Sequence, residues 1–114
     1  AYSPLARGLL TGKYIGNQIP EGSRLSRDDK IRKIVNNRSD LAIKAYIDLA
    51  SKYEINPIHM ALAFCNERSF MGSVIFGATN IIQLKKILEG LDVKLNNEIH
   101  NDIKELNKKY PMTF

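Results

Sequence analysis

Two glycine-bearing turns contain the residues of this chain that are best suited to bind a ligand. The first covers residues 3–14 and includes Gly8 and Gly12. Small residues at the end of a strand let backbone N–H groups approach a phosphate, and the Ser3 hydroxyl is a further donor. The second, residues 76–80, joins a predicted strand to a predicted helix, whose N-terminus favours an anion. Ordinary turn formation is the simpler explanation of either motif taken alone.

The two histidines and the single cysteine give little support to metal or nucleophilic chemistry. His59 and His100 lie 41 residues apart, and neither has cysteine or acidic residues at metal-ligand spacing. We therefore expect surface or helix-capping roles for both. Cys65 lies on an apolar helix face without a basic flank, which predicts a buried, unreactive thiol. The sequence predicts no catalytic and no metal-binding residue.

The charge balance is basic, with 17 Lys+Arg against 12 Asp+Glu and a net charge of +5. Such a balance suits an anionic partner, but it also serves solubility. The basic stretch Arg27–Lys33 is interrupted by Asp28 and Asp29, and no aromatic stacking platform accompanies it. We therefore do not expect nucleic acid as a partner.

Composition and length favour one globular domain. The 114 residues are 44% hydrophobic and 25% charged, close to the average for a globular chain. No apolar run is long enough to span a membrane, and no signal-peptide layout is present. One cysteine excludes an intramolecular disulfide. These absences predict a cytoplasmic protein without a membrane partner.

The expected elements are two short strands and four helices. A strand ends at Tyr2, since Pro4 cannot continue it, and a polar loop follows from Ile15 to Asn37. A buried strand is predicted at Val74–Phe76. The helices are expected to begin at Ser39–Asp40, at Asn56–Pro57, after Asn80 and at Asn96, and the last ends before Pro111. Their apolar stripes are Ala42, Ala45, Tyr46, Leu49 and Tyr53; Met60, Ala61, Phe64 and Cys65; Leu84, Ile87, Leu88 and Leu91; and Ile99, Ile103, Leu106 and Tyr110.

Two strands joined through helices imply parallel pairing. A parallel sheet needs cover on both faces and more than two strands to be stable alone. The pattern therefore indicates a piece of a larger α/β fold.

Three motifs together resemble the C-terminal part of the aldo-keto reductase superfamily, near the branch of the potassium-channel β subunits and related bacterial reductases. Residues 2–14 read Tyr-Ser-Pro-Leu-Ala-Arg-Gly-Leu-Leu-Thr-Gly-Lys-Tyr, and residues 57–64 read Pro-Ile-His-Met-Ala-Leu-Ala-Phe. Val-Ile-Phe-Gly-Ala-Thr begins at Val74, and Gln83-Leu84 follows. The likeness covers essentially the whole chain, and the first motif is highly specific.

The resemblance implies that residues 1–114 are the C-terminal fragment of a (β/α)8 TIM barrel, with its last two β/α units and the C-terminal helix. Both turns would lie at the C-terminal face of the barrel, where such active sites are built. In the family that face binds NADP(H). By position, the implied cofactor-binding residues are Ser3, Pro4, Leu5 and Gly8 along the pyrophosphate, Lys13 nearby, Arg24 at the adenosine 2′-phosphate, and Gly77, Ala78, Thr79 and Gln83 around the adenosine ribose and phosphate.

Two departures from the family pattern affect this reading. Lys86 and Ile87 occupy positions where relatives place an acidic residue and an asparagine against the adenine; Ile87 can pack on the adenine but cannot hydrogen-bond its edge. The catalytic aspartate, tyrosine, lysine and histidine of the family belong to earlier strands, which these residues do not include. Tyr2 and Lys13 are not members of that tetrad.

The function that the resemblance implies is the cofactor-binding part of an NADP(H)-dependent carbonyl oxidoreductase, inactive alone. The missing N-terminal barrel portion or another protein chain is the expected partner. The alternatives are a non-catalytic interaction subunit and the relic of a disrupted gene.

Overall fold

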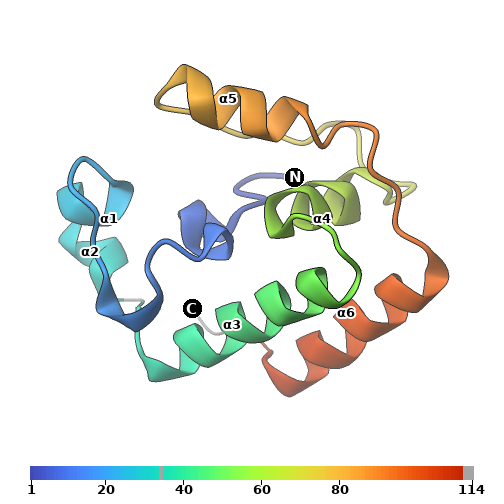
Figure 1. Ribbon diagram of the computed structural model, residues 1–114, viewed down its shortest axis with the longest axis horizontal. Coiled ribbons are helices and arrows are strands. Elements are labelled where there is room, and N and C mark those ends of the chain that lie inside the picture. Colours follow the sequence, from blue (N-terminus) through green and yellow to red (C-terminus); the bar gives the residue numbers. More distant parts are fainter. Residues whose placement is uncertain (34, 112–114) are drawn as a thin grey trace.

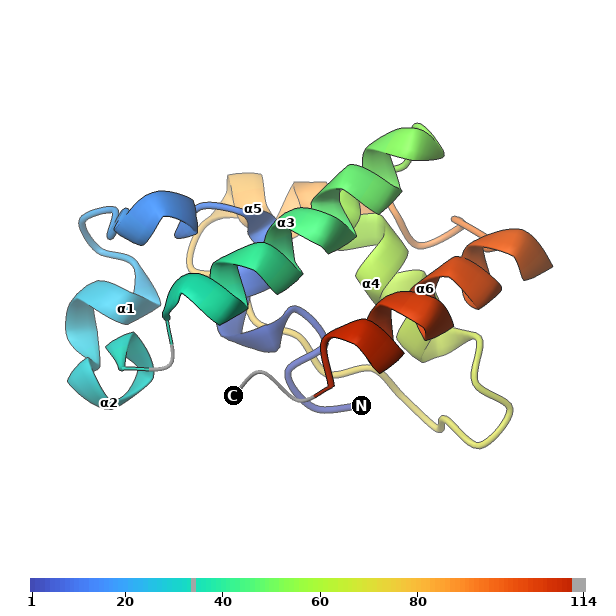
Figure 2. The same ribbon diagram turned by 90° about the horizontal axis from the view of Figure 1, so that it is seen from below.

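The computed structural model describes residues 1–33 and 35–111 as a helix-rich fold (Figure 1). Its elements in chain order are the 3-10 helices η1 (Ala6–Thr11) and η2 (Ile15–Asn17) and the α-helices α1 (Arg24–Arg27), α2 (Asp29–Arg32), α3 (Asn37–Lys52), α4 (Pro57–Asn66), α5 (Ile81–Leu88) and α6 (Asn97–Lys109). Helices α3, α4 and α6 lie together, whereas α5 lies on the other side of α4 (Figures 1 and 2). Within the described residues no helix is long and apolar enough to cross a membrane.

Asparagine side chains begin the four long helices because their amide oxygens accept the first free backbone N–H groups. The predicted starts at Asn56, Asn80 and Asn96 are confirmed, with acceptor distances of 2.9–3.0 Å. The predicted start of α3 at Ser39 is wrong. Asn36 is the cap, because it accepts from the Ser39 N–H at 3.0 Å while the Ser39 hydroxyl accepts from the Asn36 N–H at 2.9 Å.

One parallel β-bridge, between Tyr2 and Ile75, stands where two strands were predicted. The Ile75 N–H donates to the Ala1 carbonyl at 2.8 Å. The parallel direction agrees with the prediction, but the predicted burial of residues 74–76 is wrong, since Ile75 is 60% exposed. An apolar β-branched run lies buried when strands and helices cover it on both sides. No further strand flanks this bridge in the described part of the chain.

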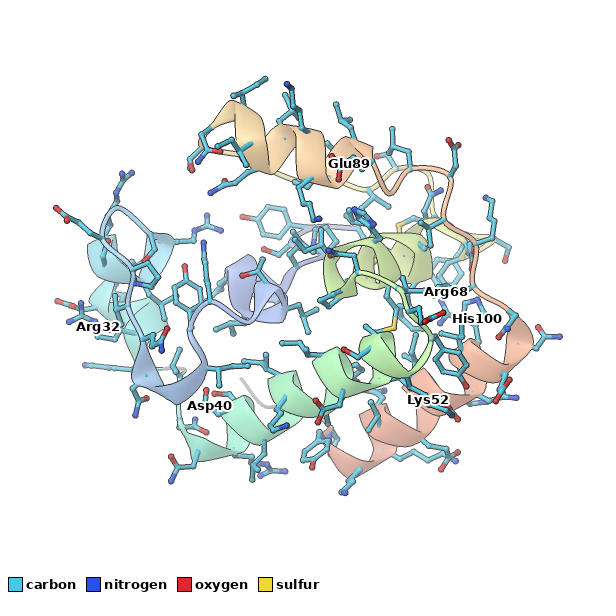
Figure 3. The ribbon with its side chains drawn as sticks, in the orientation of Figure 1. Arg32, Asp40, Lys52, Arg68, Glu89 and His100 are labelled. Atoms are coloured by element: carbon cyan, nitrogen blue, oxygen red, sulfur yellow. The ribbon has the colours of Figure 1, made fainter. Side chains whose placement is uncertain are left out.

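The segment from Ile15 to Asn37 contains η2, α1 and α2, so the prediction of a plain loop is wrong. Its anchor is Leu25, which is fully buried and shares a small core with Leu9, Tyr14 and Ile43. Asp40, at the start of α3 (Figure 3), accepts from the Gly16 N–H at 3.1 Å. One leucine and one carboxylate thus hold a largely polar segment against the fold.

The larger core lies between α3, α4 and α6. Its buried residues are Leu49, Ala50, Met60, Ala63, Leu95, Ile99 and Ile103. The predicted stripes of α3 and α6 supply three of these seven residues, namely Leu49, Ile99 and Ile103, and the predicted stripe of α4 supplies Met60. The stripe predicted for α4 is only partly right, because Leu62 and Ala63 are buried, whereas Ala61, Phe64 and Cys65 are half-buried. These three line an apolar groove of about 440 Å³ beside residues 1–4.

Helix α5 buries little of its predicted stripe. Ile87 is 3% exposed and Leu84 is half-buried, but Leu88 and Leu91 are 45% and 59% exposed. Ile82, on the opposite side, is 76% exposed. The helix is therefore attached to the rest of the fold along a narrow line.

Candidate functional site

The first turn is a compact, internally bonded loop. The Ala6 N–H donates to the Ser3 carbonyl and the Gly8 N–H to the Leu5 carbonyl, both at 2.9 Å. Gly8 has φ +94°, which a side chain would strain. Ser3, Ala6 and Arg7 also have positive φ, between +49° and +59°. Each non-glycine residue in this region costs roughly 1–2 kcal/mol, and such strain accumulates at functional sites.

Lys13 folds back over this turn. A Cβ built on Gly8 would lie 3.5 Å from Lys13 Cε and 3.6 Å from its Nζ, so the ammonium stands beside the glycine. The same Nζ lies 5.0 Å from the centre of the Tyr14 ring, within range of a cation–π interaction. The turn therefore presents a positive charge next to the half-buried backbone of Gly8. The Gly8 and Ala6 N–H groups already donate within the turn, which leaves ligand contacts to Lys13 and the Ser3 hydroxyl.

Arg24 is the first residue of α1 and is exposed. Its neighbour Leu25 packs in the same small core as Leu9 and Tyr14, which flank the first turn. This shared core brings α1 next to the turn that contains Gly8 and Lys13. A guanidinium held there suits a phosphate, because it donates in a planar fork.

The second turn is ordered by its own side chains. Gln83 Oε1 accepts from the Thr79 N–H at 3.0 Å and from the Thr79 hydroxyl at 3.1 Å. Asn80 caps α5 through the Gln83 N–H. Gly77 and Ala78 are exposed, and no atom lies within 4 Å of the position of a Cβ on Gly77. The backbone at Gly77 is therefore exposed, with space beside it.

The parallel bridge relates the two turns. Because Tyr2 and Ile75 run in the same direction, Ser3 and Phe76 leave the bridge at the same edge. The start of α5 is also the end of that helix nearer to α1 in both views (Figures 1 and 2). No hydrogen bond or ion pair within the described residues joins the first turn to the second.

The side chains of Lys86 and Ile87 lie in different surroundings. Lys86 Nζ lies 3.9 Å from Glu89 Oε2, one helical turn away, so it faces an acid on its own helix. Ile87 is 3% exposed and is the buried residue of α5. The Ile87 side chain therefore packs within the described fold, and its contact with an adenine stays a prediction.

Sequence reasoning missed three side-chain contacts outside the two turns. His59 Nε2 lies 2.6 Å from the Lys86 carbonyl, which links α4 to α5. His100 Nε2 lies 2.8 Å from Glu67 Oε2, so this histidine belongs to a partly buried pair rather than to the open surface (Figure 3). Arg68 covers the Phe64 ring at 4.0 Å. No local sequence pattern predicts the two histidine contacts, since each histidine lies 27 or 33 residues from its partner.

Cys65 is half-buried, and burial raises the pKa of its thiol. The thiol is therefore neutral near pH 7, which agrees with the predicted lack of reactivity. Residues 3–14 and 76–80 contain cationic, hydroxyl and amide side chains and no carboxylate, which suits the binding of an anion.

A sequence model of the Aldo/keto reductase family matches residues 1–108. Protein tas of Escherichia coli (strain K12) is 34% identical over 110 residues, which cover 96% of this chain and 32% of that protein. A probable voltage-gated potassium channel subunit beta of Oryza sativa subsp. japonica is 32% identical over 103 residues, covering 81% of this chain and 29% of the relative. L-glyceraldehyde 3-phosphate reductase of Escherichia coli (strain K12) is 32% identical over 97 residues, covering 81% and 28%.

The chain thus spans about a third of the length of the relatives that it matches. Membership of this family implies a (β/α)8 barrel, and its members typically use a nicotinamide cofactor. A helix-rich chain with one parallel bridge is consistent with a fragment of such a barrel. The family match over nearly every residue confirms the resemblance read from the three motifs. The chain belongs to the aldo/keto reductase family.

Proposed function

We propose that this chain forms the C-terminal, NADP(H)-binding portion of an aldo-keto reductase that interconverts carbonyl compounds and alcohols. The observation that carries the proposal is the Tyr2–Ile75 bridge, which directs both glycine-bearing turns to one edge. Lys13 places a cation beside Gly8, and Arg24 precedes Leu25, which shares a small core with Leu9 and Tyr14 of the first turn. NADP(H) offers three phosphates to such a surface.

In this proposal each part of the cofactor meets a different group of residues. Ser3, Pro4, Leu5 and Gly8 run along the pyrophosphate, and Lys13 neutralises part of its charge. Arg24 binds the 2′-phosphate of the adenosine. Gly77, Ala78, Thr79 and Gln83 border the adenosine ribose. The bound cofactor supplies hydride transfer at its nicotinamide ring.

The chain contributes binding rather than proton transfer. Tyr2 is 81% exposed, and no lysine of the described residues forms a hydrogen bond or cation–π contact with it, so it is not prepared as a general acid. We therefore assign the acid to the N-terminal barrel portion, and residues 1–114 are the C-terminal part of that domain. By themselves these residues reduce no carbonyl compound.

Arg24→Ala tests the cofactor assignment in the chain completed by the N-terminal two-thirds of Protein tas, with Arg27→Ala on the same helix as the matched control. A charge-assisted contact contributes about 1.5–3 kcal/mol, or roughly ten- to a hundredfold in affinity. Fluorescence titration should therefore show NADPH binding weakened by about that factor in Arg24→Ala, with NADH binding and the Arg27→Ala variant nearly unchanged. Equal losses for both cofactors would contradict the role of Arg24, and failure of the unaltered chain to saturate with NADPH would contradict the function itself.

Association with another protein without catalysis is a second candidate. It is favoured by the exposed apolar side chains beside the bridge and on α5, namely Tyr2, Phe70, Ile75 and Ile82. One of the relatives is named as a probable channel subunit beta. Joining the chain to the N-terminal two-thirds of Protein tas separates the two functions. NADPH-dependent turnover supports the enzyme, and NADPH binding without turnover supports the interaction subunit.

A further inference from the structure

We propose that His59 is a positioning residue for the second turn. Its ring fastens the C-terminal end of α5 to α4 and thereby fixes where the other end presents Thr79 and Gln83. The inference rests on the cofactor role proposed above, because it concerns how that site is held. It involves a residue of α4 that no contact places in the site itself.

The first observation is the hydrogen bond between His59 and the end of α5. His59 Nε2 lies 2.6 Å from the Lys86 carbonyl oxygen. Since a carbonyl only accepts, Nε2 carries the hydrogen and donates it. The Gly90 N–H, which would be the ordinary helical partner of that carbonyl, donates to Ile87 instead at 3.2 Å. The imidazole therefore satisfies one of the carbonyl groups that every helix leaves free at its C-terminus.

The second observation is the fit of the ring against Gly90. A Cβ on Gly90 would overlap the Cγ and Cδ2 atoms of the His59 ring. Gly90 is buried, and its φ is not in the left-handed region, so the close approach of the ring rather than the backbone conformation requires a glycine here. The ring is thus held both by a hydrogen bond and by contact with the backbone of the segment that follows α5.

The third observation is that α5 has few other attachments. Ile87 is its one fully buried residue, and it lies at the same end as Lys86 and Gly90. Ile81 and Ile82, at the beginning of the helix, are 62% and 76% exposed. Glu89, labelled in Figure 3, marks the anchored end beside α4, whereas the opposite end extends toward α1. The second turn therefore lies between the bridge at Ile75 and the exposed beginning of α5, whose fully buried residue is near its other end.

A small tilt of α5 at its anchored end would move its other end enough to affect ligand binding. A helix of eight residues is about 12 Å long, so a tilt of about 10° at the anchored end moves the free end by about 2 Å. Displacements of about 1 Å are enough to weaken oriented contacts strongly. Loss of the His59 hydrogen bond should therefore displace Thr79 and Gln83 although His59 contacts neither.

The test compares four variants of the chain, each joined to the N-terminal two-thirds of Protein tas so that the domain is complete, by two measurements. His59→Ala removes the hydrogen bond, His59→Gln restores a donor at similar reach, and Gly90→Ala displaces the ring. His100→Ala, at the histidine on α6, is the matched control for loss of general stability. Amide hydrogen exchange reports on α5 without cofactor, and fluorescence titration reports on NADPH affinity.

We expect His59→Ala and Gly90→Ala to accelerate exchange in α5 by about tenfold relative to α3, and to weaken NADPH binding by about three- to tenfold. His59→Gln should restore both values to within about twofold of the unaltered chain. His100→Ala should change exchange in α3, α4 and α6 without singling out α5.

Three results overturn the inference in distinguishable ways. If the unaltered chain binds NADPH and Arg24→Ala weakens that binding, but His59→Ala binds as well as the unaltered chain, His59 does not position the site and the proposed function survives. If the unaltered chain shows no saturable NADPH binding, the proposed function fails and the inference fails with it. If His59→Gln exchanges in α5 as fast as His59→Ala and binds NADPH as weakly, the hydrogen bond is refuted as the cause.

Discussion

Glu67→Ala is expected to lower the free energy of unfolding by about 2–4 kcal/mol, because this carboxylate joins three parts of the fold. Oε1 accepts from the Leu95 N–H at 2.9 Å, and Oε2 lies 2.8 Å from His100 Nε2. The Glu67 and His100 side chains are only 14% and 26% exposed, so water screens these bonds weakly. A hydrogen bond to a charged group contributes about 1.5–3 kcal/mol, and an orphaned buried donor adds a cost of about 1–3 kcal/mol. Because both side chains are partly exposed and the structure around the alanine can relax, we expect the total loss to lie at the lower end of the sum of these contributions.

Urea unfolding followed by circular dichroism measures this effect, with Glu67→Gln as the control. The glutamine amide oxygen still accepts from the Leu95 N–H, but it has no negative charge for His100. We therefore expect it to cost about half as much as alanine. A fixed concentration of a stabilising osmolyte brings all three transitions into a measurable range. A loss below about 0.5 kcal/mol for alanine, or equal losses for both variants, would refute the reasoning.

Three further predictions concern the chain as a whole. The isolated chain should be at best marginally stable, since the bridge and α5 expose apolar side chains such as Ile75 and Ile82; a cooperative thermal melt of a monomer with protected bridge amides would contradict this. It should not oxidise NADPH with 4-nitrobenzaldehyde, and turnover that persists after contaminating reductases are removed would refute that expectation. Hydrogen bonds from Lys52 and Tyr53 lower the pKa of Asp102. The stability that these bonds give is therefore lost as the pH falls below about 4. When unfolding is followed during an acid titration, Asp102→Asn should lose less stability than the unaltered chain, and an unchanged acid response would contradict the assignment.

Helix positions were readable from the sequence wherever the start signal was local. Asn56, Asn80 and Asn96 each combine a side-chain acceptor with an apolar stripe that begins within the first turns, and the structure starts a helix at each. The start of α3 was misplaced because two good caps, Asn36 and Ser39, stand three residues apart and act together. The local sequence therefore identified the helix but not which of Asn36 and Ser39 is its N-cap.

Burial was harder to predict, because it depends on partners far along the chain. Val74–Phe76 has the composition of a buried strand, yet Ile75 is exposed where only Tyr2 pairs with it. The pairings of His59 and His100 likewise depend on backbone or side chains brought close by the fold. The assignment of Ser3, Lys13, Arg24 and Gln83 to a cofactor came from resemblance and stays a prediction. What the structure adds is the common edge from which their two turns depart.

The Tyr2–Ile75 bridge also sets the order in which the chain acquires its shape during synthesis. The paired residues are separated by 73 positions in the sequence. Because translation proceeds at about 5–20 residues per second, Ile75 is synthesised roughly 4–15 s after Tyr2. Through that interval the first turn has only its internal bonds and the small core around Leu25 to hold it. The apolar residues at its start are then available to chaperones and to other nascent chains. Slowing translation between these two positions should raise aggregation of the newly made protein more than slowing it after Ile75.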